Sequence, residues 1–170
     1  ERLAESGGEG SDRLLAMAAR CRKVPMEPAE SFFEAIQSVW SMFLINPDSL
    51  GRIDQYLYPY YRRETEAGTL SRAVALEWLQ ELFVKVFETQ VNNLALPISG
   101  HNHLVVGGYL QDGRDGYNEL AALILEAIAE LPTFRPQVSF RYTNQTTAQT
   151  LRYVTALNRR CPLIVFVNDE

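Results

Sequence analysis

LVVGGYL, residues 104 to 110, is the stretch on which the fold class depends. The stretch is predicted to be a buried strand from Leu104 to Leu110, because Leu104, Val105 and Val106 form a short continuous apolar run. Gly107 and Gly108 lack the third glycine and the strand-to-helix setting of a dinucleotide-binding loop. We therefore expect them to permit a close approach of two backbones within a packed sheet.

Helices and strands alternate after this strand. The predicted elements are a helix with apolar residues from Leu120 to Leu131, a strand at residues 137–142, a helix begun by a capping box of Thr146 with Gln149, and a buried strand at residues 163–167. Strand, helix, strand, helix, strand is the order of a parallel α/β unit. The sequence thus predicts a helix-rich α/β segment over residues 1–170, mainly helical over 1–100 and β-α-β-α-β over 101–170.

Helical patterns dominate the first hundred residues. Ser31 with Glu34 has the capping-box form and begins a helix that we expect to reach about Ile45. Ser71 begins a second amphipathic helix. A shorter helical pattern ends near Cys21, whose position on the apolar face predicts a buried side chain.

Composition and charge exclude several classes of partner. Sixteen Lys and Arg residues against 21 Asp and Glu give a net charge of -5. The basic residues are scattered, so no concentrated positive face is available for nucleic acid. No apolar run is long enough to cross a membrane. Cys21 and Cys161 lie far apart and favour no disulfide, which points to a reducing cytoplasm.

His101-Asn102-His103 brings the two histidines of the sequence close together. In an extended chain both rings would point to one face and could share a metal ion. A metal site needs a third ligand, and none stands at a recognisable spacing, so a substrate-lining or plain polar role is favoured.

The loop from Asp112 to Asp115, followed by Glu119, is too short for a calcium site and carries an arginine, which favours a turn with a helix cap.

GRIDQYLYPYY, residues 51 to 61, contains four tyrosines within six positions. Aromatic platforms for nucleic acid carry interleaved Lys and Arg, whereas acidic residues offset the flanking arginines here. A helical turn with Tyr56 and Tyr60 on one face, and Leu57 with Tyr61 on the next, would instead anchor large rings in a core or interface.

The same stretch resembles a signature of the glycyl radical enzymes related to pyruvate formate-lyase, in their dehydratase, decarboxylase and C–N lyase branch. Three further stretches match in the same order: residues 28–37 (PAESFFEAIQ), Val106-Gly107-Gly108 with Asp112-Gly113-Arg114-Asp115 and Asn118-Glu119-Leu120, and Asn168-Asp169-Glu170. The resemblance covers nearly the whole chain and implies a segment of an α/β barrel, with outer helices and the first barrel strands.

The resemblance also implies a mechanism and partners. A radical S-adenosylmethionine activating enzyme would install a glycyl radical, which would act through a cysteine on a small polar substrate. Both radical-carrying residues are expected beyond Glu170, so no catalytic residue, metal or organic cofactor is expected in this segment, and Cys161 is not given that role. A homodimer is expected for the full-length enzyme, which would catalyse dehydration, decarboxylation or C–N or C–C cleavage. The alternative is a non-catalytic α/β scaffold or binding module derived from the family.

Two positions match places that line the substrate pocket in this branch. Ser49 stands two residues before the Gly-Arg pair, and His101, followed by Asn102-His103, stands where the family usually has an aromatic residue followed by Gln-Asn. Ser49, His101 and His103 are therefore the candidate substrate-binding residues, and the imidazole indicates a polar or anionic substrate. Only residues 41–50 separate Trp40 from Gly51, a shorter connection than is usual in the family, which predicts either a differently shaped pocket or omitted residues.

Overall fold

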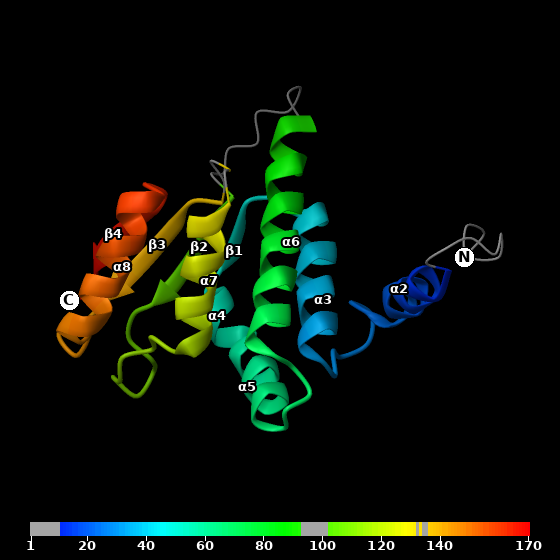
Figure 1. Cartoon of the computed structure of the whole chain (residues 1–170), viewed down its shortest axis with the longest axis horizontal. Helices are drawn as coiled ribbons and strands as arrows, with labels where there is room; N and C mark the ends of the chain where they lie inside the picture. The colour runs from blue at the N-terminus through cyan, green and yellow to red at the C-terminus, as the bar shows by residue number, and fades with distance from the viewer. Residues whose placement is uncertain (1–10, 93–101, 132, 134–135) are drawn as a thin grey trace.

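The computed structural model describes residues 11–92, 102–131, 133 and 136–170 (Figure 1). In chain order its elements are α2 (Ser11–Lys23), α3 (Phe32–Ile45), β1 (Ser49–Gly51), α4 (Ile53–Tyr56), α5 (Tyr58–Glu66), α6 (Arg72–Asn92), β2 (His103–Gly107), α7 (Glu119–Glu130), β3 (Val138–Tyr142), α8 (Ala148–Arg160) and β4 (Ile164–Asn168). The helix-rich α/β prediction is confirmed. Among the described residues, no helix is both long enough and apolar enough to span a membrane.

The four strands form one parallel sheet in the order β1-β2-β3-β4. β1 was not predicted, because a three-residue strand shows too little alternation to be recognised and Asn46 to Ser49 has the composition of a turn. Its partner is β2, with Ser49 opposite His103 and a register irregularity before Gly51. This pairing brings two distant segments of the chain together at the start of the sheet.

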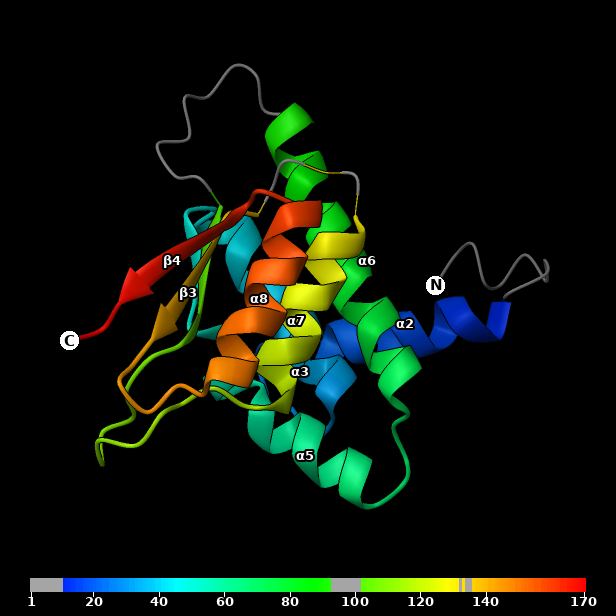
Figure 2. The same ribbon diagram turned by 60° about the vertical axis from the view of Figure 1, so that its left-hand side comes forward.

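One face of the sheet is packed against helices. α7 and α8 lie along this face, and no helix of the described residues lies on the other (Figure 2). Side chains alternate between the two faces of a strand. Six strand residues that point to the helices are at most 5 % exposed: Leu50, Leu104, Val106, Val138, Phe140 and Ile164. The opposite side chains form the uncovered face.

Two predicted boundaries need correction. β2 ends at Gly107 rather than Leu110, because Gly107 and Gly108 have φ values of +74° and +82° and turn the chain out of the strand. The last helix is capped by Thr147 rather than Thr146, with the Thr147 hydroxyl accepting from the N–H of Thr150 at 3.1 Å. The Thr146 hydroxyl is occupied elsewhere, by the Asp115 carboxylate at 2.7 Å.

The prediction that Cys21 is buried was wrong. Cys21 is exposed, as are Leu15 and Met17 on the same helix. α2 extends away from the rest of the described chain and meets it mainly at α3 (Figure 1). A helical pattern identifies an apolar face but not what covers it. Cys161, by contrast, is buried in the core at the end of α8.

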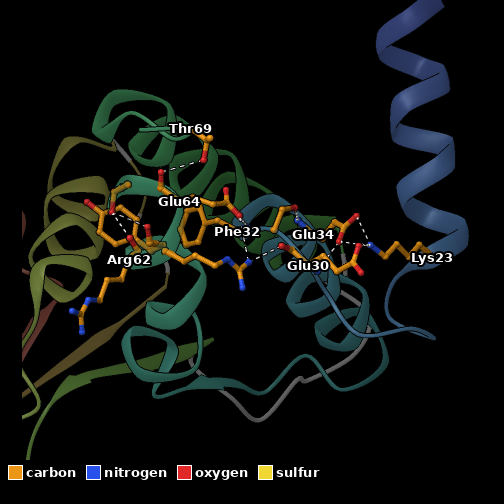
Figure 3. Close-up of polar contacts among 11 residues, drawn as sticks. Lys23, Glu30, Phe32, Glu34, Arg62, Glu64 and Thr69 are labelled. Carbon is orange, nitrogen blue, oxygen red and sulfur yellow. Dashed lines mark hydrogen bonds and ion pairs between the residues drawn. The ribbon is translucent and has the colours of Figure 1, made fainter. Parts of the chain in front are cut away.

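Polar contacts join the entry of α3 to α2 and α5 (Figure 3). Ser31 caps α3 as predicted, accepting from the N–H of Glu34 at 3.1 Å. The Glu34 carboxylate reaches one residue further back than expected and accepts from the N–H of Glu30 at 2.8 Å. It also pairs with Lys23 at the end of α2. Glu64 on α5 accepts from the Phe32 N–H at 2.7 Å, so α2 and α5 both contact the start of α3.

The tyrosines of residues 51 to 61 serve as anchors, although the stretch forms two short helices divided at Leu57. Leu57 and Tyr61 are buried, and the Tyr61 ring packs edge-on against Phe32 with centroids 5.6 Å apart. Tyr56 is 42 % exposed, but its hydroxyl donates to the Leu50 carbonyl at 2.7 Å. The Tyr58 hydroxyl bonds to Glu119 at 2.5 Å. The hydroxyls therefore fasten these helices to β1 and α7.

Candidate functional site on the uncovered sheet face

Three polar side chains, Ser49, His103 and Ser139, form a row across the uncovered face of β1, β2 and β3. The Ser49 hydroxyl donates to the backbone carbonyl of His103 at 2.9 Å and accepts from the N–H of Gly51 at 3.1 Å. The His103 ring atom Nε2 lies 2.8 Å from the Ser139 hydroxyl. Two of the residues predicted to bind substrate are thus in direct contact.

The third predicted residue, His101, lies outside the described residues. Its neighbour Asn102 is fully buried and donates to the Val86 carbonyl of α6 at 3.3 Å. Asn102 has a φ of +45°, so the chain is not extended there and the premise for two rings on one face fails. Within the described residues, no group of three or more His, Cys, Asp or Glu could hold a metal ion.

A second polar cluster lies where β2 ends. The Arg52 guanidinium donates to the carbonyls of Gly107 at 2.6 Å and Tyr109 at 2.9 Å. The Asp54 carboxylate accepts from the N–H of Gly107 at 2.8 Å. The adjacent Gln55 amide donates to the carbonyl of Gly116 at 2.8 Å. Residues 52 to 55 therefore hold both sides of the glycine turn and the loop that follows it.

The two glycines are required by close contacts, as predicted. A Cβ on Gly107 would lie 2.5 Å from the backbone oxygen of Arg141, and one on Gly108 would lie 2.8 Å from the Asp169 carboxylate. The Arg141 guanidinium pairs with Asp169, with Nε at 2.7 Å from Oδ1. The other oxygen of Asp169 accepts from the Tyr109 N–H at 2.7 Å. The ends of β2, β3 and β4 are therefore tied together.

The two carboxylates of this cluster have opposite pKa shifts. Burial raises the pKa of Asp54 to about 6, and the N–H of Gly107, the Gln55 amide and the charge of Arg52 offset part of that rise. Burial also acts to raise the pKa of Asp169, but the Tyr109 N–H and the Arg141 guanidinium outweigh it and hold the pKa below its ordinary value. Among the described residues, Asp54 Oδ1 and Arg52 Nε are buried without a hydrogen-bond partner. Asp54 is the more costly of the two carboxylates to ionise.

The acidic loop after β2 is a turn, as expected. The Gly113 N–H donates to the Leu110 carbonyl at 3.0 Å, and the Asp112 carboxylate is paired with the side chain of Arg114. The helix cap that follows is Asn118, whose side chain accepts from the Ala121 N–H at 2.9 Å. The Asp112 carboxylate is paired with Arg114, so the loop is unsuited to calcium because of this charge as well as because it is too short.

A hollow of about 410 Å³ lies beside Ser49, between α3 and β1. Its lining is mostly apolar and includes Val39, Met42, Phe43 and Tyr56. Met42 is 54 % exposed. The connection between α3 and β1, which was expected to shape the pocket, forms one wall of this hollow through Asn46.

Sequence reasoning did not propose Ser139, Arg52, Asp54 or Arg141 as members of a site. The alternation of residues 137–142 places Ser139 on the face opposite Val138 and Phe140, but it does not show whether that face meets solvent or a ligand. No local signal links Arg52 and Asp54 to Gly107, because the contacting residues are more than fifty positions apart. The only available indication was the motif GR-x-DQ itself.

The chain resembles known proteins along its whole length. A family model described as pyruvate formate lyase-like matches residues 1–170. Isethionate sulfite-lyase of Desulfovibrio desulfuricans is 32 % identical over 180 residues, covering 92 % of this chain and 21 % of the relative. Indoleacetate decarboxylase of Tractidigestivibacter scatoligenes is 36 % identical over 160 residues, covering 85 % and 18 %.

A solved structure shares the fold. It concerns 1,2-propanediol dehydration in Roseburia inulinivorans and superimposes with a TM-score of 0.84 at 29 % identity, covering 99 % of this chain and 23 % of that one. The chain thus spans about a fifth of the length of these relatives.

Proposed function

Because the chain belongs to the pyruvate formate lyase-like family of glycyl radical enzymes, as a segment of their α/β barrel, we propose that it forms part of the substrate-facing wall of a radical lyase. The relatives are named for dehydration, decarboxylation and release of sulfite. Each of these reactions cleaves a bond from carbon to a leaving group: C–O in dehydration, C–C in decarboxylation and C–S in release of sulfite. We propose the same class of reaction for the protein that contains this chain.

The observation that supports this role is the uncovered sheet face. Its strands expose Ser49, His103 and Ser139 on one side while the other side is packed with helices. Polar side chains in a row on a rigid sheet are suited to orienting a small ligand. The ring of His103 would contact the substrate. The hydroxyl of Ser49 fixes the backbone of His103 and retains one lone pair for a substrate donor.

The radical chemistry is proposed to come from other parts of the same polypeptide. When installed, a glycyl radical would supply the hydrogen abstraction that starts bond cleavage. The described residues would bind and orient the substrate and exclude water from it. A radical S-adenosylmethionine activating enzyme, a homodimeric assembly and a cytoplasmic location complete the proposal.

The test is anaerobic activation of the protein that contains this chain. With its activating enzyme, we expect a glycyl radical signal in electron paramagnetic resonance and turnover of a small polar substrate, followed by mass spectrometry of the products. His103→Ala should lower kcat/KM while leaving the radical yield and the melting temperature close to the wild type. Unchanged kinetics in this variant would contradict the role of His103, and absence of a radical would contradict the lyase.

We also propose that His101 lines the substrate pocket together with Ser49 and His103. His101→Phe should alter the choice among polar substrates, because it replaces a hydrogen-bonding ring with an apolar one. The relative kcat/KM for two substrates is the measurement. An unchanged ratio would count against a pocket role for His101.

A further inference from the structure

Ser139 lies at the middle of the uncovered face. Val138 and Phe140, its neighbours in β3, are fully buried on the helical side, so Ser139 points to the opposite side. Its register partners on the adjacent strands are Val105 and Val165. Ser139 is therefore a polar side chain between two valines, and Val165 is 42 % exposed on this face.

The contact between His103 and Ser139 sets the direction of the histidine ring. In the strand register Ser139 stands opposite Val105, which is two residues beyond His103. To reach the Ser139 hydroxyl at 2.8 Å, the ring must lean along the strand toward the middle of the sheet. Ser139 thus holds the imidazole over the centre of the uncovered face.

The hydroxyl of Ser139 has hydrogen-bonding capacity left. A serine hydroxyl has one donor and two acceptor positions. Ser49 uses its donor and one acceptor on the backbone of its own and the next strand. Among the described residues, the Ser139 hydroxyl bonds only to His103. Ser139 is therefore better placed than Ser49 to bond directly to a ligand.

The charges on this face also restrict the ligand. Arg141 is the one permanently charged residue within β1 to β4, and Asp169 neutralises it. Recognition of a carboxylate or sulfonate would call for an unpaired cation, which these strands do not place on the face. Two hydroxyls and an imidazole are suited to an uncharged hydroxyl group, which can both donate and accept.

We propose that Ser139 is a specificity-determining residue that, together with His103, binds an uncharged hydroxyl group of the substrate. This inference rests on the proposed function. It adds a residue that the family resemblance did not indicate, and it narrows the substrate from polar or anionic to hydroxyl-bearing. The valines beside Ser139 would contact the carbon chain of the ligand.

Equilibrium binding tests the inference without the radical. 1,2-Propanediol and ethanesulfonate, an anion that has no hydroxyl group, are titrated into the unactivated protein that contains this chain, with binding followed by NMR. We expect 1,2-propanediol to bind, and Ser139→Ala to weaken its binding about three- to tenfold, the loss of one uncharged hydrogen bond. Ser139→Thr should restore most of the affinity. Thr155→Ala, which removes a hydroxyl from the exposed surface of α8, is the matched control and should bind as the wild type does.

Several results would overturn the inference. Wild-type protein that binds ethanesulfonate but not 1,2-propanediol contradicts the substrate class, and Ser139→Ala that binds 1,2-propanediol as tightly as the wild type contradicts the role of Ser139. In the activated enzyme we expect Ser139→Ala to raise KM with little change in kcat. If binding follows expectation and no radical turnover occurs, the proposed function fails alone. If turnover occurs and Ser139→Ala is silent in both assays, this inference fails alone.

Discussion

The Asp54 carboxylate accepts a hydrogen bond of 2.8 Å from the backbone N–H of Gly107, a residue 53 positions later in the chain. Asp54 is fully buried, and Gly107 is the last residue of β2. This bond joins the short helix α4 to the end of the central strand, at the point where the chain turns away from the sheet. The exit of β2 is therefore set by a side chain from a distant segment.

Removing the Asp54 carboxylate should destabilise the folded protein at the end of β2. Asp54→Ala leaves the buried Gly107 N–H without an acceptor, which costs about 2 kcal/mol. Asp54→Asn keeps an acceptor and should cost less. The measurement is the melting temperature at pH 7 of the protein that contains this chain, with Asp48→Ala, an exposed site, as the control. Equal melting temperatures for Asp54→Ala and Asp48→Ala would show that the bond contributes nothing.

The raised pKa of Asp54 predicts a pH dependence with a definite sign. Its pKa is about 6 in the folded protein and near 3.8 when unfolded, so the folded state binds the proton more tightly between these values. Stability from this group is present below about pH 4 and is lost as pH rises through about 6, an effect of about 3 kcal/mol.

Asp54→Asn cannot ionise and should not show this loss. The difference in melting temperature, Asp54→Asn minus wild type, should therefore increase from pH 4 to pH 7. A difference that stays constant, or that decreases over this range, would contradict the raised pKa of Asp54 in the folded protein.

The glycine turn offers a matched pair of substitutions. Gly107 and Gly113 both have positive φ, at +74° and +81°, so alanine is strained at either site. A Cβ at Gly107 also meets the Arg141 backbone oxygen at 2.5 Å, whereas one at Gly113 meets nothing within 4 Å. We expect Gly113→Ala to cost about 1 kcal/mol and Gly107→Ala about 3 kcal/mol or more. Thermal unfolding of both variants distinguishes the clash from the strain, and equal losses would rule out the clash.

Periodicity explains which parts of the fold were predictable. α3, α6 and α7 each bury a face of apolar residues spaced three and four apart, β3 alternates between buried and less buried residues, and β4 is an apolar run. These signals are local, so a single sequence contains them. β1 has three residues, too few to show a period, and its identity as a strand comes from its pairing with β2. The wrong prediction that Cys21 is buried has the same cause, because burial also depends on which segment packs against the helix, and a local pattern does not show that.

The candidate site was predictable only in part. The family resemblance pointed to Ser49 and to His101 with the following Asn102-His103; His101 lies outside the described residues, and the structure places Ser49 in contact with His103. Ser139 was not proposed, because a serine within an alternating strand has the same local pattern whether it faces solvent or a ligand. Arg52 was interpreted as one of the arginines that flank the tyrosines, and Asp54 as one of the acidic residues that offset their charge. Their contacts to Gly107 arise from the topology, which brings α4 beneath β2.

The pair of Arg141 and Asp169 predicts a stability effect that an exposed ion pair does not have. The Asp169 side chain is 9 % exposed and also accepts from the Tyr109 N–H at 2.7 Å, so Asp169→Asn removes a charge-assisted contact in a site shielded from water. We expect a loss of about 2 kcal/mol at pH 7. Because the pKa of Asp169 is lowered, its contribution is present above the unfolded value of 3.8 and is lost as pH falls below it. The variant should therefore approach the wild type in stability in acid.

The matched control is Glu66→Gln, which breaks the exposed pair with Arg62 and should leave the melting temperature unchanged. A loss in Asp169→Asn no greater than that in Glu66→Gln, or one that persists unchanged at pH 3, would contradict the proposed contribution of this ion pair.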